Sequence, residues 1–77
     1  MVVEVLRTVI CALIDDPDTV RITKIEGDSL SVLEVKVSRD DIGKLIGRHG
    51  KTADALRTLV NCISAKNNQR YILQIVD

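Results

Sequence analysis

The sequence predicts a small α+β domain whose elements follow the order α-β-β-α-α-β. Its 77 residues leave room for one hydrophobic core, and 45% of them are hydrophobic, which is enough to form it. Apolar residues recur at three- and four-residue spacing in some segments and alternate with polar residues in others. These are the periodicities of amphipathic helices and of strands, so both kinds of element are expected.

The first segment has a helical pattern that ends at an acidic turn. Its apolar positions are Val2, Val5, Leu6, Val9, Ile10 and Leu13. Asp15-Asp16-Pro17-Asp18 then ends the helix, because the residue before a proline avoids the helical region. No basic segment precedes this helix, and Glu4 and Arg7 interrupt its apolar run, so we expect a cytoplasmic protein rather than an exported one.

A β-hairpin follows the acidic turn. The first strand is expected from Val20 to Ile25, and residues 26–29 have the composition of a turn. The second strand is indicated by Leu33, Val35 and Val37, which alternate with charged or polar residues. The alternation slips near Val32, which could mark a β-bulge.

Two helices and a strand make up the second half of the chain. Ser38, followed three residues later by Asp41, indicates a capping box that opens a helix. The segment Gly47–Gly50 interrupts the helical pattern, and Lys51 restarts it in a helix that ends between residues 65 and 68. A last strand is predicted by the alternating residues Tyr71, Leu73 and Ile75.

The composition excludes several classes of function. The chain has no Trp and no Phe, and its one Tyr cannot form the aromatic platform on which RRM and OB folds stack bases. It has two Cys without a CxxC pair and a single His, so we expect reduced thiols, no metal site and no cofactor. Charge is balanced overall, at 11 basic and 11 acidic residues, yet residues 1–43 carry net −4 and residues 44–77 net +4. An anionic partner is therefore expected on the second half.

The Gly47–Gly50 loop is the segment whose chemistry is most specific. Glycine has no Cβ to hold a ligand away from the main chain, and the helix that begins at Lys51 presents its positive end there. Lys44, Arg48, Lys51 and Arg57 surround the loop, with Asp54 as the only acid between residues 44 and 57. The loop alone could also be a tight turn with a solvated charge cluster, but its place in the predicted element order favours a phosphate-binding role.

A resemblance to a known family rests on the loop, its flanking helices and the element order. The segment reads Ile42-Gly43-Lys44-Leu45-Ile46-Gly47-Arg48-His49-Gly50-Lys51-Thr52, followed by Ala55-Leu56-Arg57. With this order of elements, it resembles the KH RNA-binding domain in its bacterial type II arrangement, and the short chain resembles the small stand-alone KhpA type. The resemblance covers nearly the whole chain, so residues 1–77 are expected to form one KH domain with its GxxG loop at 47–50.

The resemblance implies both a fold and a function. The fold would be a mixed three-stranded sheet covered by three helices, and the function would be single-stranded RNA binding, as an RNA chaperone or post-transcriptional regulator. KH loops clamp about four nucleotides. By position, Gly47 and Gly50 would let the backbone of the RNA approach, while Arg48, His49 and Lys51 would contact phosphates. Base-groove residues implied in the same way are Ile42, Ile46 and Val35, which could equally belong to the core.

Two features leave alternatives open. His49 stands where a longer polar residue is common in the family, so it could make binding depend on pH near 6.5 or could have no special role. The resemblance also implies a homodimer, or a heterodimer with a larger KhpB/Jag-type RNA-binding protein. The chain could therefore serve mainly as a protein-interaction module, and its small core would favour association. Because the chain has both Gly47 and Gly50, RNA binding is favoured over a role as a protein-interaction module alone.

Enzymatic activity is not expected. Gly50-Lys51-Thr52 matches the end of a P-loop, but the first glycine of that motif would fall at position 45, which is Leu45. The segment before the loop is also helical rather than extended, and 77 residues are too few for the usual nucleotide-binding sheet. One His without an evident Ser or Cys partner gives no basis for nucleophilic catalysis.

Overall fold

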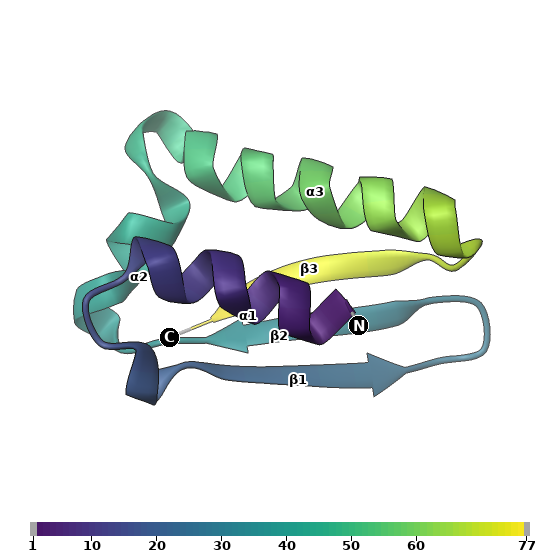
Figure 1. The fold of residues 1–77 in the computed structure, drawn as a ribbon, viewed down its shortest axis with the longest axis horizontal. Coiled ribbons are helices and arrows are strands. Elements are labelled where there is room, and N and C mark those ends of the chain that lie inside the picture. The colour runs from purple at the N-terminus through teal and green to yellow at the C-terminus, as the bar shows by residue number, and fades with distance from the viewer. Residues whose placement is uncertain (1, 77) are drawn as a thin grey trace.

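The computed structural model describes residues 2–76, and its elements follow the predicted α-β-β-α-α-β order (Figure 1). In chain order they are α1 (Val2–Leu13), η1 (Pro17–Thr19), β1 (Arg21–Glu26), β2 (Ser31–Lys36), α2 (Arg39–Ile46), η2 (Arg48–Gly50), α3 (Lys51–Asn67) and β3 (Tyr71–Val76). The short elements η1 and η2 are single 3-10 turns. Positions 1 and 77 of the expected domain lie outside the described residues.

The strands form a mixed three-stranded sheet in the order β1-β2-β3. β1 pairs antiparallel with β2, so the predicted hairpin is confirmed, and β2 pairs parallel with β3. The ladder between β1 and β2 is continuous, so the suspected bulge at Val32 is wrong. Val32 breaks the polar alternation because it lies between Ile25 and Ile72 in the sheet, in a row of apolar residues on the face away from the helices.

The helices cover one face of the sheet and bury an aliphatic core against it (Figure 1). Both Leu33 and Val35 of the central strand are fully buried, as expected for a strand with a neighbour on each side and helices above. The largest fully buried side chains are Leu6, Ile10, Leu33, Val35, Leu45 and Val60. The cysteines do not share one environment, since Cys11 is partly buried and Cys62 is exposed on α3, and both are free thiols.

The start of α2 differs from the prediction. Ser38 is the N-cap, but its side chain makes no capping hydrogen bond, so the expected capping box is wrong. The carboxylate of Asp41 instead accepts hydrogen bonds from the backbone N–H groups of Asp15 at 3.4 Å and Asp16 at 3.1 Å. Asp41 is buried, and it ties the turn after α1 to the helix that leads into the glycine loop.

Candidate nucleic-acid interface

The backbone of the glycine loop adopts conformations that favour glycine. Gly47, His49 and Gly50 all have positive φ, at 76°, 57° and 75°. The N–H of Gly47 donates to the carbonyl of Gly43 at 2.9 Å, and the N–H of Gly50 donates to the carbonyl of Gly47 at 3.1 Å. These bonds close the loop on itself between α2 and α3, at the end of the molecule where α2 packs (Figure 1).

The two glycines of the loop are required for different reasons. A Cβ built on Gly47 would lie 2.7 Å from the Cβ of Thr52 and 2.9 Å from its backbone nitrogen, closer than real contacts allow. A Cβ built on Gly50 would meet no atom within 4 Å. Gly47 therefore lets the first turn of α3 pack against the loop, whereas the α-carbon of Gly50 faces open space that a ligand can enter.

Three basic side chains of the predicted site surround this open surface. Arg48, His49 and Lys51 are exposed, and within residues 2–76 none of them takes part in an ion pair. The positive end of α3 adds to their field, because its first N–H groups lack helical acceptors. The arrangement can attract an anion and hold it against the main chain.

Lys44, also predicted to contact phosphates, is already engaged by carboxylates. Its Nζ forms an ion pair with Asp15 and lies 3.6 Å from Oδ1 of Asp41. The hydrogen bond to Asp15 raises the pKa of Lys44, although partial burial acts in the opposite direction. Lys44 therefore serves to neutralise the acidic turn, and its charge is less available to a ligand than those of the loop. The sequence could not show this, because Asp15 lies 29 residues away.

The contacts that Asp41 makes with Asp15, Asp16 and Lys44 depend on its carboxylate remaining ionised. Burial alone would raise the pKa of Asp41, but the N–H groups of Asp15 and Asp16 and the charge of Lys44 outweigh it. The pKa is held below its ordinary value of 3.8. At neutral pH the carboxylate therefore connects α1, the turn and α2.

The apolar residues assigned to the base groove separate into two groups. Ile46 is 39% exposed beside the loop, and Ile42 is partly buried against the core, so a ligand can reach both. Val35 has no exposed surface, and its assignment to the groove is wrong. It lies in the central strand beneath the helices, where a ligand could touch it only if the core opened.

A surface that the sequence analysis missed lies between α3 and the outer edge of β3. A groove of about 230 Å³ runs there, lined on one side by residues of α3 that include Arg57 and on the other by Tyr71 and Leu73. The N–H of Tyr71 points outward and donates to Oγ of Ser64 at 3.1 Å, whereas the carbonyl of Arg70 points inward to the N–H of Ser31 at 2.8 Å. Successive residues of a strand direct their backbone N–H and carbonyl groups to opposite sides of the strand. The N–H and carbonyl of Leu73, two residues after Tyr71, therefore also point outward and face the groove. The sequence analysis missed this surface because it depends on β3 lying at the edge of the sheet, and local sequence patterns do not reveal the order of strands.

Arg57 is the one residue of the predicted site that borders this groove. Its guanidinium lies 3.9 Å from the carboxylate of Asp54, and the two side chains are 49% and 79% exposed, so the pair is loose and weak. Within residues 2–76 no cluster of His, Cys, Asp or Glu is arranged to hold a metal ion. No helix in this range has the length and apolar character needed to cross a membrane.

Comparison with known proteins identifies the family of the chain. The model of the family described as "KhpA/KhpB, KH domain" matches residues 3–75. RNA-binding protein KhpA of Borreliella burgdorferi is 41% identical over 75 residues, which cover 97% of this chain and 92% of that protein. RNA-binding protein KhpA of Treponema pallidum is 40% identical over 96% of this chain and 92% of its own length. The Aquifex aeolicus protein of the same name is 42% identical over 84% and 82%.

The family match agrees with the mixed sheet, the order of elements and the loop between α2 and α3. The predicted resemblance to type II KH domains is therefore confirmed. The chain belongs to the KhpA/KhpB family of KH-domain proteins.

Proposed function

We propose that the protein binds single-stranded RNA and grips its backbone with the Gly47–Gly50 loop. The observation that carries this proposal is the open surface at Gly50, where a Cβ would meet nothing within 4 Å, next to the exposed Arg48, His49 and Lys51. A phosphate can reach the main chain at this point and find positive charge on both sides. The relatives named RNA-binding protein KhpA support the same ligand.

The neighbouring surfaces give the RNA bases a place to lie. Ile46 and the partly buried Ile42 offer aliphatic contact beside the loop, and the edge of β3 offers the backbone N–H and carbonyl of Leu73. Without aromatic stacking, each base contributes little, so we expect micromolar affinity. Weak and reversible contact of this kind suits an RNA chaperone or post-transcriptional regulator, and we propose that the protein acts on transcripts in the cytoplasm.

The loop assignment is tested by replacing Arg48 and His49 together with Asp. Asp tolerates the positive φ of His49, and both side chains are exposed, so the thermal midpoint should hardly change. RNA affinity, measured by fluorescence anisotropy, should fall at least tenfold. The matched control combines Arg21→Asp with Lys36→Ala, which changes the net charge equally on the open face of the sheet. Equal losses in the two double variants would contradict the loop assignment.

A second function, self-association, is favoured by an apolar surface that adjoins the loop at Lys51. An apolar groove of about 370 Å³ lies between α1 and α3, lined mainly by Val9, Leu13, Ala55 and Leu59. Leu13 is 41% exposed there, although water contact with a large aliphatic side chain is unfavourable. We propose that a second copy of the chain covers this groove, because a core of this size gains stability from association. A KhpB/Jag-type protein would compete for the same face.

Sedimentation of single-site variants tests the dimer. Leu13→Glu should shift the protein toward an 8.5 kDa monomer, because a charge would have to be buried in the interface. Ile25→Glu is the control, since Ile25 is 50% exposed on the opposite face and should leave the mass unchanged. A wild-type protein that stays monomeric at high concentration would refute the homodimer.

A further inference from the structure

Asp41 is a buried charged side chain that the proposed loop function does not use. It is 3% exposed and lies in the first turn of α2, where its carboxylate accepts hydrogen bonds from the backbone N–H groups of Asp15 and Asp16. Burial of a carboxylate is costly unless hydrogen bonds and an opposite charge compensate it, and here the two N–H groups and Lys44 supply both. A buried polar group that is satisfied in this way holds its partners in one arrangement.

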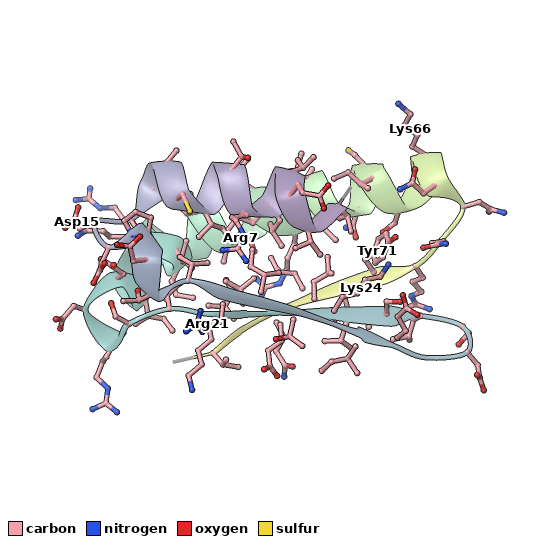
Figure 2. All side chains as sticks on the ribbon, turned by 60° about the horizontal axis from the view of Figure 1, so that its bottom comes forward. Arg7, Asp15, Arg21, Lys24, Lys66 and Tyr71 are labelled. Carbon is pink, nitrogen blue, oxygen red and sulfur yellow. The ribbon has the colours of Figure 1, made fainter. Side chains whose placement is uncertain are left out.

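The turn that donates these hydrogen bonds is itself held in place. The residues that flank it, Ile14 and Val20, are both buried, so its two ends are anchored in the core. The carbonyl of Asp16 accepts hydrogen bonds from the N–H of Thr19 at 3.2 Å and from its hydroxyl at 2.8 Å. Figure 2 shows Asp15 at the end of the molecule where this turn runs beside α2. The turn is therefore a rigid support for that helix.

The position of Asp41 within α2 determines how the glycine loop is presented. Leu45 also holds α2 to the core, but apolar packing is not directional, whereas hydrogen bonds are. Asp41 precedes Gly47 by six residues, which is about 9 Å along the helix at about 1.5 Å per residue. Over that length a tilt of about 3° moves Gly47 by about 0.5 Å, which is the tolerance of a well-formed binding site. A small change at Asp41 can therefore misalign the loop.

On the basis of the loop function proposed above, we propose that Asp41 is a positioning residue for RNA binding, which aligns the Gly47–Gly50 loop with the RNA backbone without contacting the RNA. Asp41 is buried, so a phosphate cannot reach it, and its negative charge would repel one. The charge of Asp41 and its hydrogen bonds therefore have opposite effects on RNA affinity. Removal of the charge alone would strengthen binding, whereas loss of the hydrogen bonds that orient α2 weakens it.

Asp41→Asn separates these two effects, because asparagine has the same shape without the charge. Oδ1 of Asp41 accepts from Asp15 and Oδ2 from Asp16, and the amide group of asparagine turns one of these acceptors into a donor. Affinity for fluorescein-labelled oligouridine and oligoadenosine, measured by anisotropy well below the thermal midpoint, should fall about three- to tenfold, the effect of one hydrogen bond. The slope of log affinity against log salt should not change, since no phosphate contact is removed. In ¹⁵N NMR spectra of the free variant, the amide signals of residues 47–51 should shift.

Asp40→Asn is the matched control, because it is the same substitution at the adjacent residue of α2, where the side chain is exposed. It should leave the RNA affinity and the loop signals unchanged. The proposal is overturned if Asp41→Asn binds RNA as tightly as the wild type or more tightly, or if Asp40→Asn lowers the affinity by the same factor. A shallower salt slope for Asp41→Asn, or a loss of affinity with the loop signals unmoved, would also overturn it.

The wild-type protein supplies a second measurement that does not depend on the variant folding. When RNA binds the loop, the amide signal of Asp16 should shift together with that of Gly47, because linkage between two sites is reciprocal. An Asp16 signal that stays in place at RNA saturation would contradict a positioning role for Asp41. The Arg48→Asp/His49→Asp variant keeps Asp41 and tests the loop alone, so failure of the loop function and failure of the positioning role give different results.

Discussion

Replacing the two loop glycines by alanine should have very different effects on stability. Gly47 has φ 76° and ψ 171°, a region that is essentially restricted to glycine and costs another residue about 1–3 kcal/mol. A new Cβ would also press against Thr52, and overpacking of this kind typically costs about 1–3 kcal/mol. The two effects together predict a loss of about 2–6 kcal/mol for Gly47→Ala.

Gly50 carries only part of this penalty. Its φ of 75° and ψ of 13° lie in the left-handed helical region, which costs alanine about 1–2 kcal/mol, and no atom stands in the way of a Cβ. Alanine also lowers the conformational entropy of the unfolded chain, which stabilises the folded state by about 0.4–1 kcal/mol. Gly50→Ala should therefore lose about 1 kcal/mol, and Gly50→Asn less, because Asn adopts this conformation more readily.

Urea denaturation followed by circular dichroism measures the difference. A small domain has a total stability of about 3–5 kcal/mol, so Gly47→Ala should lose most of its folding transition. Gly50→Ala should keep a cooperative transition, with a thermal midpoint lowered by about 4–8 °C. Equal destabilisation of the two variants would refute the reasoning, since the contact between Gly47 and Thr52 is what separates them.

Three further predictions follow from the packing and charges around the loop. Val35→Ala should destabilise the fold by about 2 kcal/mol, measured by urea denaturation, while the folded fraction keeps its RNA affinity, because Val35 is fully buried. Lys44→Ala should weaken RNA binding less than Lys51→Ala, because the amino group of Lys44 is paired with Asp15. Since this pairing leaves about three cations near the loop to contact phosphates, the wild-type protein should bind a short RNA with a slope of log affinity against log salt of about −2. The pKa of Asp41 is lowered in the folded protein, so its contribution to stability is complete above pH 3.8 and is lost as the pH falls through the pKa of the folded state. Thermal midpoints recorded from neutral to acid pH should therefore fall less steeply for Asp41→Asn than for the wild type, although the variant starts from a lower midpoint at neutral pH.

The element order could be predicted because it depends on local patterns. The helical spacing of α1, the turn at residues 26–29 and the glycine interruption each show directly in the sequence, and each matches the structure. The capping box failed because Asp41 satisfies backbone groups 25 and 26 residues away instead of those of its own helix. A local motif cannot show that a distant turn competes for the same carboxylate.

The candidate site was predictable only in part for a similar reason. The loop residues are consecutive, so sequence alone brings Arg48, His49 and Lys51 together. Val35 was misplaced because alternation shows that a residue faces inward but not whether a groove or the core lies there. The groove along β3 depends on the parallel pairing of β2 with β3, which joins segments that are 40 residues apart in the chain.

The most direct test of RNA binding through the glycine loop is a titration of the ¹⁵N-labelled protein with a short single-stranded RNA, followed by NMR. The amide signals of Gly47–Thr52 should move first and furthest, with smaller changes at Leu73 on the edge of β3. Signals of Ile25 and Val32 on the open face of the sheet should stay in place. Shifts concentrated on that face, with the loop signals unmoved at saturation, would contradict the account.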